Sequence, residues 1–272
     1  FMPEGPETRR MADGLSKAVK KKDLISYQFL HPNIDTLNNL KGINIIDISS
    51  LGKTIITRLN IGKSIMTHNQ LYGKWTINLT NTVVKHNRKL RIEYKTSKKI
   101  ARLWSATDIV LLETEKENTH HYIKNLGPDV LNNFVTIETI ANQLESKKFR
   151  NRNLGGLLLN QNFIAGLGNY LRSEILFFSG LLPTIRPSDL DADQIYNLSN
   201  SIKCISMRAY HQKGNTIDKD DFSKKFGNIF NFRLIRHMVF GRKDQPCFNC
   251  SNKVIKSVQN SRRLYYCREC QI

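Results

Sequence analysis

The residues with the most specific spacing are four cysteines near the C-terminus. Cys247, Cys250, Cys267 and Cys270 form the pattern C-x2-C-x16-C-x2-C. Two thiolates separated by two residues can face one tetrahedral ion, and the doubled pattern is typical of a structural zinc site. The spacing predicts one bound Zn2+; two disulfides are the alternative, which an intracellular chain disfavours. The fifth cysteine, Cys204, is expected to be a buried small hydrophobic residue on the apolar face of a helix.

The segment Met2-Pro3-Glu4 offers covalent chemistry. Removal of an initiator methionine would leave Pro3 as a free secondary amine that is partly unprotonated near neutral pH. Such an amine can attack an electrophilic sugar carbon and form an iminium, which is Schiff-base chemistry. Glu4 lies beside it and could move protons at the same sugar. Most chains that begin Met-Pro make no such use of the proline, so an N-terminus without chemistry is the alternative.

Two loops suggest contacts with a polyanion. Gly166-Leu167-Gly168-Asn169-Tyr170-Leu171-Arg172 is predicted to be a glycine turn that opens a helix, where free N–H groups and Asn169 could bind a phosphate. A helix cap with a tight helix crossing is the alternative. Gln70-Leu71-Tyr72-Gly73 places apolar side chains on a loop between strands, and such side chains can wedge into a base stack. For this loop the alternative is a strand end in the core.

The elements that must position these residues change along the chain. Residues 6–20 are predicted to form a helix, because Met11, Leu15, Ala18 and Val19 share one face. From about residue 24 to 112 the pattern is one of short β-branched strands separated by glycines, which favours a β-sandwich or barrel. Examples of the predicted strands are 43–48, 54–59, 75–80, 90–95 and 100–104. After Gly127-Pro128 the pattern becomes helical, and the cysteine segment closes the chain.

The composition points to a nucleic-acid partner. The 272 residues include 42 Lys and Arg against 23 Asp and Glu, which gives a formal net charge of +19 spread over the whole chain. Phosphate backbones are the commonest partner of such a field. An anionic membrane surface is the alternative, but no basic amphipathic helix with a bulky aromatic face stands out. The sequence has no apolar run of membrane-spanning length and no secretory signal at its start, so a soluble intracellular protein is expected.

Taken together, these residues resemble one family from Met2 to Cys270. Six segments recur in its order, namely residues 2–7, 52–53, 68–73, 127–131, 166–172 and 261–262 ahead of Cys267. They look like the formamidopyrimidine-DNA glycosylase/endonuclease VIII family, and the trio Gln70-Leu71-Tyr72 is similar to its endonuclease VIII branch. The resemblance implies an α+β fold with an N-terminal β-sandwich, a helical domain with a helix–two-turn–helix, and a C-terminal zinc-finger hairpin. The domains would be 1–126, 127–237 and 238–272, with DNA between the two halves.

The resemblance also implies roles for single residues. Pro3 would be the nucleophile at C1′ of the damaged nucleoside, and Glu4 the acid-base partner, with Glu7 a further acid. Lys53 would bring a cation to the deoxyribose and its phosphate, and Arg262 on the zinc hairpin would contact the phosphate and assist the second elimination. The residues expected to bind DNA are Gln70, Leu71 and Tyr72, which would fill the gap left by the flipped lesion, with Asn125 and Asn169.

Three positions depart from the family pattern. Phe1 precedes Met2, and with Phe1 in place the Pro3 nitrogen is an amide that cannot attack; we expect translation to begin at Met2. Asn125 stands where an arginine is expected, so its DNA contact would be uncharged or be replaced by Lys124. Asn160 stands where an aspartate is expected, which should matter less.

The resulting hypothesis is a base-excision-repair DNA glycosylase and AP lyase. It would remove oxidised pyrimidines from double-stranded DNA through a Schiff base on Pro3 and nick the strand by β,δ-elimination. It would be a monomer in the bacterial cytoplasm, at the nucleoid, with one structural zinc ion and no membrane partner. There are two alternatives. One is a glycosylase of the same family for oxidised purines, and the other is a non-catalytic DNA-binding relative whose Pro3 is not N-terminal.

Overall fold

The computed structural model describes residues 3–84, 87–227 and 235–272, so Phe1 and Met2 lie outside the described residues. The chain divides into two compact units, Phe1–Asn125 and Leu126–Ile272. Among the described residues, no helix combines the length and the apolar character needed to cross a membrane.

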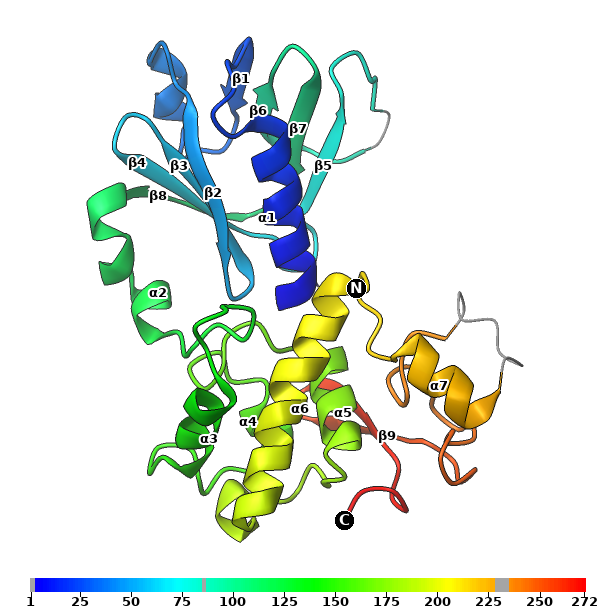
Figure 1. The fold of residues 1–272 in the computed structure, drawn as a ribbon. Helices are drawn as coiled ribbons and strands as arrows, with labels where there is room; N and C mark the ends of the chain where they lie inside the picture. Colours follow the sequence, from blue (N-terminus) through cyan, green and yellow to red (C-terminus); the bar gives the residue numbers. More distant parts are fainter. Residues whose placement is uncertain (1–2, 85–86, 228–234) are drawn as a thin grey trace. The chain divides into compact units, whose positions relative to one another are not determined.

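The first unit is built on two four-stranded antiparallel sheets (Figure 1). One sheet has the strand order β1-β6-β7-β5 and the other β2-β3-β4-β8. The strands are β1 (Ser26–Phe29), β2 (Ile45–Leu51), β3 (Thr54–Leu59), β4 (Lys63–His68), β5 (Lys74–Leu79), β6 (Leu90–Lys95), β7 (Lys99–Trp104) and β8 (Asp108–Glu113).

Both sheets contribute to one apolar core, which confirms the predicted β-sandwich. Phe29, Trp75 and Tyr94 come from the first sheet, and Ile55 and Ile65 from the second; all five are at most 2% exposed. The β-branched side chains of such strands pack well on a half-buried pleated surface, which is why this segment forms sheets.

Helix α1 (Gly5–Val19) lies along β2 and adds its apolar face to the same core (Figure 1). Ala12, Leu15 and Val19 are at most 1% exposed, at the spacing of three and four residues expected for one helix face. The predicted helix, 6–20, is therefore confirmed with a shift of one residue.

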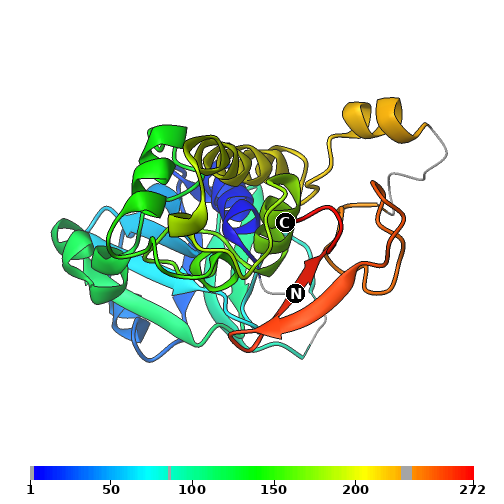
Figure 2. The ribbon, with the colours of Figure 1, turned by 90° about the horizontal axis from the view of Figure 1, so that it is seen from below.

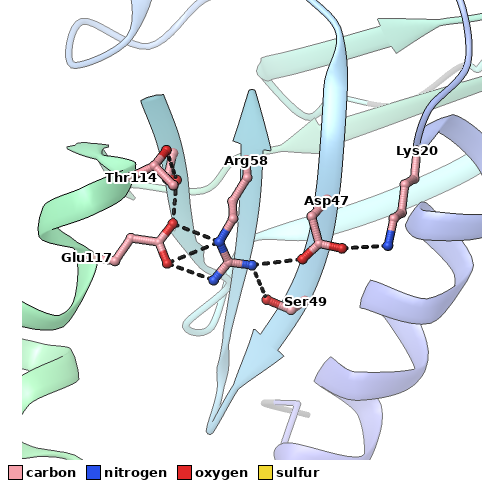
Figure 3. A network of polar contacts seen from close by, with 7 residues as sticks. Lys20, Asp47, Ser49, Arg58, Thr114 and Glu117 are labelled. Atoms are coloured by element: carbon pink, nitrogen blue, oxygen red, sulfur yellow. Dashed lines mark hydrogen bonds and ion pairs between the residues drawn. The ribbon is translucent and has the colours of Figure 1, made fainter. Parts of the chain in front are cut away.

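A polar network crosses the second sheet (Figure 3). The Arg58 guanidinium donates to Glu117 at 2.7–3.2 Å and to Asp47 at 2.9 Å, and Lys20 donates to the other Asp47 oxygen at 2.6 Å. Burial raises the pKa of the Asp47 carboxyl, but its contacts with Lys20 and Arg58 outweigh burial and hold that pKa below the usual range. The network ties the end of α1 to the 3-10 turn Thr114–Thr119, which leads into the short helix α2 (His121–Asn125).

The second unit is helical around a separate apolar core. Leu144, Leu171, Leu198 and Ile202 are fully buried in it. Helix α6 packs against both α3 and α5 (Figure 1). The helices are α3 (Ile137–Glu145), α4 (Leu154–Leu157), α5 (Asn169–Phe178), α6 (Ala192–His211) and α7 (Lys219–Phe226).

The C-terminal segment forms a two-stranded hairpin in the second unit, drawn in orange and red in Figure 2. Strand β9 (Ile255–Gln259) pairs with β10 (Arg262–Tyr266), and Arg262 lies opposite Gln259. Asn260 and Ser261 both have positive φ, 52° and 57°, as a two-residue hairpin turn of this hand requires. Arg262 is thus the first residue after the turn.

The expectation for Cys204 was wrong. This residue is exposed on α6, and its thiol donates to Asn200 Oδ1 at 3.2 Å. Ile202 and Ile205 face the core, and each helical residue turns by about 100°, so Cys204 points about 200° away from Ile202.

Candidate active site

The candidate nucleophile lies immediately before α1. Glu4 is the N-cap of this helix and is only 4% exposed. Its backbone N–H donates to Glu7 Oε2 at 3.2 Å, and Glu7 is held in turn by Arg10 at 2.9 Å. Because α1 is anchored in the core, Glu4 and Glu7 are fixed at the N-terminal end of this helix, directly after the half-buried Pro3.

Lys53 lies at the tip of the turn between β2 and β3. Leu51 pairs with Thr54 across this turn, and Gly52 has φ 58°, a conformation that glycine adopts without strain. The Lys53 cation lies near enough to His68 to act on its ionisation. Burial lowers the pKa of His68, Lys53 lowers it further, and Asp108 opposes both effects.

The loop Gln70–Tyr72 leaves His68 at the end of β4. The Gln70 N–H donates to His68 Nδ1 at 3.0 Å, which a neutral imidazole can accept, and the Gln70 side chain donates to Asp108 at 3.2 Å. Leu71 is 62% exposed and Tyr72 70%. The alternative of a buried strand end is therefore wrong, and two large apolar side chains stand in solvent beside a polar one.

Gly73 closes this loop. Its N–H donates to the Asn69 carbonyl at 2.7 Å, and a Cβ at this position would meet that same oxygen at 2.6 Å. Only glycine fits such a close backbone approach, so the motif ends in glycine for a steric reason.

Asn125 is the last residue of α2 and of the first unit. It is exposed, and its amide donates to the His121 carbonyl at 2.7 Å. Its contact with DNA stays a prediction. Asn160, the other departure from the family pattern, accepts the Asn162 N–H at 3.0 Å and so serves a local turn.

Asn169 is the first residue of α5, and Gly168 is the N-cap. The predicted glycine turn opening a helix is thus confirmed. Asn169 Oδ1 is buried and has no hydrogen-bond partner in the described part of the chain.

The same helix holds the hairpin that carries Arg262. Arg172 on α5 is fully buried, and its guanidinium donates to the carbonyl oxygens of Gly155 (2.6 Å), Arg263 (3.0 Å) and Arg262 (3.4 Å). The Arg262 side chain is exposed. The backbone of Arg262 is therefore fixed relative to Asn169, while its guanidinium can reach a ligand.

The tip of the hairpin rests on two glycines of α4. A Cβ at Gly155 would lie 1.9 Å from Gln259 Oε1, and one at Gly156 would lie 2.8 Å from Asn260 Nδ2. The Gln259 amide also donates to Asn153 at 2.7 Å. The glycines of this segment thus allow the turn before Arg262 to approach the helical unit.

The four cysteines converge as predicted. Their sulfur atoms all lie within 4.8 Å of one another, with Cys247 to Cys270 at 3.8 Å and Cys250 to Cys267 at 3.4 Å. Four ligands at about 2.3 Å around a tetrahedral ion stand about 3.8 Å apart, whereas a disulfide requires about 2.05 Å. The arrangement fits a metal ion, and all four cysteines are free.

The sequence analysis assigned no structural role to two buried residues that the structure shows to have one. Arg172 is one, and Glu174 is the other. The Glu174 carboxylate accepts the N–H groups of Met238 (2.7 Å), Val239 (2.9 Å) and Phe240 (2.9 Å) and the hydroxyl of Thr216 (2.7 Å). The sequence did offer a signal for them. Arg172 and Glu174 are opposite charges two residues apart in a helix that is mostly apolar, and a charge that such a helix buries needs a partner.

The sequence matches two family models. Residues 2–106 match the formamidopyrimidine-DNA glycosylase N-terminal domain, and residues 126–221 match the formamidopyrimidine-DNA glycosylase H2TH domain. Proteins named Endonuclease 8 from Escherichia coli (strain UMN026) and Shigella sonnei (strain Ss046) are each 38% identical over 271 residues, which is 99% of this chain and 100% of theirs.

Solved structures show the same fold. Lactococcus lactis Fpg (MutM) in complex with DNA containing N7-benzyl-Fapy-dG has a TM-score of 0.80 at 22% identity, over 99% of both chains. The same enzyme in complex with DNA containing an oxidized pyrimidine has a TM-score of 0.80 at 21% identity, again over 99% of both chains. The predicted α+β architecture is thereby confirmed.

Proposed function

Since the chain belongs to the formamidopyrimidine-DNA glycosylase/endonuclease VIII family and is a bifunctional base-excision DNA glycosylase and AP lyase, we propose that it removes oxidised pyrimidines such as thymine glycol from double-stranded DNA. One observation carries this choice of substrate. The full-length identity to proteins named Endonuclease 8 is 38%, against 21–22% to the Fpg structures.

Pro3 would carry the covalent step. Its nitrogen lone pair forms a bond to C1′ of the damaged nucleoside, and the glycosidic bond breaks with its electrons going to the base. The proton of the attached nitrogen passes to the departing base, which restores the nitrogen lone pair. The C1′–O4′ bond then opens as this lone pair forms the iminium, and O4′ takes a proton from Glu4. The burial of Glu4 next to Pro3 supports this assignment, because a proton donor must be held within reach of the atom it serves.

The iminium makes strand cleavage possible. It acidifies the C2′ proton, whose loss expels the 3′ phosphate in the β-elimination. Loss of a C4′ proton then expels the 5′ phosphate in the δ-elimination. Lys53 would neutralise charge at the sugar and its phosphate, and Arg262 would hold the phosphate that leaves in the second step. Asn169 would donate to the DNA backbone beside the lesion.

Gln70, Leu71 and Tyr72 would occupy the space that the lesion leaves. Extruding a base costs a few kcal/mol, and least for a damaged base that stacks poorly. Apolar side chains that enter the stack offset part of this cost. The exposure of Leu71 and Tyr72 supports this role.

The ion of the four-cysteine cluster would be zinc, and its role structural. Zinc favours four thiolates in tetrahedral geometry, and a closed shell leaves no position for a substrate. When bound, the ion would stabilise the fold of the hairpin and thereby hold Arg262. The enzyme would act as a monomer on chromosomal DNA in the bacterial cytoplasm.

Borohydride trapping on a duplex with one thymine glycol tests the mechanism. Reduction of the iminium should yield a stable protein–DNA adduct that maps by mass spectrometry to the peptide beginning at Pro3. A chain verified to retain Phe1 and Met2 should give neither adduct nor cleavage, since its Pro3 nitrogen is an amide. An adduct from that chain would overturn the assignment and make Lys53 the first alternative nucleophile.

A panel of substrates tests the choice of lesion. We expect faster excision of thymine glycol and dihydrouracil than of 8-oxoguanine and formamidopyrimidines, measured as kcat/KM on matched duplexes. The opposite ranking would assign the chain to the purine-specific enzymes of the family. Tight duplex binding without excision of any lesion would assign it to a non-catalytic DNA-binding role.

A further inference from the structure

A cationic hollow lies beside Tyr72 at one end of the sheet β1-β6-β7-β5. Three separate segments meet there because Trp104 at the end of β7 pairs with Lys74 on one side and with Leu90 on the other. Tyr72 lies just before β5, Arg88 and Lys89 just before β6, and Ser105 just after β7. The hollow has a volume of about 550 Å³ and is lined by Tyr72, Asn87, Arg88, Lys89, Arg91 and Ser105.

The lining carries three positive charges and no acidic residue. In the described part of the chain, neither Lys89 nor Arg91 forms an ion pair. Arg91 Nε is buried and has no hydrogen-bond partner there. A buried N–H without an acceptor is unfavourable, so the Arg91 guanidinium has hydrogen-bonding capacity that the described part of the chain leaves unused.

The backbone around the hollow is well anchored. Arg88 Nη1 donates to the carbonyl oxygen of Tyr72, so this cation is tied to the proposed wedge loop. The Ser105 N–H donates to the Lys89 carbonyl at 2.7 Å, and the Leu30 N–H donates to the Arg91 carbonyl at 2.8 Å. The Arg88 cation and the backbone positions of Lys89 and Arg91 are thus fixed before a ligand arrives, which lowers the entropy cost of binding.

We propose that this hollow binds a phosphodiester group of the DNA strand opposite the lesion. The inference rests on the proposed function, in which Tyr72 enters the stack at the position of the extruded base. The lesion strand already has its assigned contacts, namely Lys53, Asn169 and Arg262. A cationic site beside the wedge loop Gln70–Tyr72 is therefore available to bind the complementary strand. Arginine with a neighbouring lysine suits phosphate oxygens, because guanidinium donates two parallel hydrogen bonds.

Binding to an uncleavable duplex tests the proposal independently of chemistry. Lys89→Gln/Arg91→Gln should bind a duplex with one tetrahydrofuran abasic analogue about 10-fold more weakly than wild type at 0.1 M salt. It should bind the single-stranded form of the same oligonucleotide equally well. Lys98→Gln, which removes an exposed charge at the opposite end of the same sheet, is the matched control and should behave as wild type.

A neutral methylphosphonate moved along each strand identifies the contacted group. One or two positions in the complementary strand should weaken wild-type binding and leave the double variant unaffected. Equal losses of the double variant on single-stranded and duplex DNA, or sensitivity confined to the lesion strand, would overturn the proposal. If the double variant does not fold, Lys89→Gln alone provides the same comparison of duplex with single-stranded binding, because the Lys89 side chain is exposed. If no lesion is excised but these binding results hold, only the proposed chemistry fails.

Discussion

Glu4 is a buried carboxylate next to the proposed nucleophile, and its substitution should separate two reactions that both need Pro3. Glu4→Gln keeps the shape of the side chain but replaces the acidic carboxyl group by an amide that cannot donate a proton to the sugar. We expect excision of thymine glycol to fall at least about 100-fold, the range for loss of a general acid. Cleavage at a pre-formed abasic site should persist in part, because its aldehyde has no base to lose. Glu113→Gln, on an exposed strand end, is the control, and equal losses on both substrates would argue against the role of Glu4.

Leu71 and Tyr72 are expected to act on base extrusion and not on the sugar. Leu71→Ala/Tyr72→Ala should slow excision from duplex DNA about 10-fold or more, since the vacated stack is no longer filled. Incision at an abasic site in single-stranded DNA should change little. Single-turnover rates on the two substrates measure the difference. Phe134→Ala, which truncates a side chain 91% exposed in the other unit, should affect neither.

Single residues were predictable from the sequence where type and spacing are both unusual. The cysteine pattern predicted a cluster that the structure contains, and the glycines before Asn169 predicted a helix start. Arg172 and Glu174 were missed because their partners, mostly backbone atoms, are 17 to 91 residues away, which no local pattern reveals. Pro3, Glu4, Lys53 and Arg262 keep their roles as predictions.

At the scale of elements, Arg172 should determine how firmly the hairpin is held. Arg172→Met removes the donors to three carbonyl oxygens and should cost on the order of 3 kcal/mol of stability in this contact. Hydrogen exchange of β9 and β10 should accelerate, and strand nicking should fall about 10-fold because Arg262 is less well placed. Arg150→Met, on an exposed arginine of the same unit, is the control. Unchanged exchange in β10 would contradict the role of Arg172.

Removal of the metal should act on the same element. Chelation should unfold the segment that contains the four cysteines, because so short a segment has little core of its own. Thermal unfolding of the β-sandwich, followed by the fluorescence of its two tryptophans, Trp75 and Trp104, should be almost unchanged. Elemental analysis of active protein should give one zinc per chain. Active protein without zinc would rule out the structural role.

The strands show where local pattern suffices for elements. The predicted ranges 54–59 and 90–95 match β3 and β6, which contribute Ile55, Leu59, Ile92 and Tyr94 to one core. Strand β4 was not predicted individually, because Ser64 and Thr67 are buried in it. Ser64 donates to Glu117 and shares a hydrogen bond with Thr114 at 2.9 Å, so its burial depends on a distant segment. Such partners are set by tertiary structure and leave no trace in local periodicity.

At the scale of the whole molecule, the net charge of +19 should make DNA binding steeply dependent on salt. If Z phosphates are neutralised, log K falls with log salt at a slope of about −0.9Z. Arg262→Gln should flatten this slope by roughly one unit, and Lys148→Gln should not. Fluorescence-anisotropy titrations between about 50 and 300 mM salt would measure this slope, because the salt dependence of DNA binding is large in that range. A wild-type slope near zero would contradict the electrostatic interpretation.

Helix α5 also places a constraint on how this protein can change over generations. Its ten residues carry Asn169 at the first position, Arg172 three positions later and Glu174 two positions after that. Each residue of an α-helix adds a rise of about 1.5 Å and a rotation of about 100°, so the number of residues in α5 fixes the relative positions of these three side chains. A substitution in α5 can be offset by a change in a neighbour. An insertion of one residue after Asn169 would rotate Arg172 away from the hairpin and Glu174 away from residues 238–240 at the same time. Lineages of this enzyme should therefore tolerate replacements in α5 but not changes of its length.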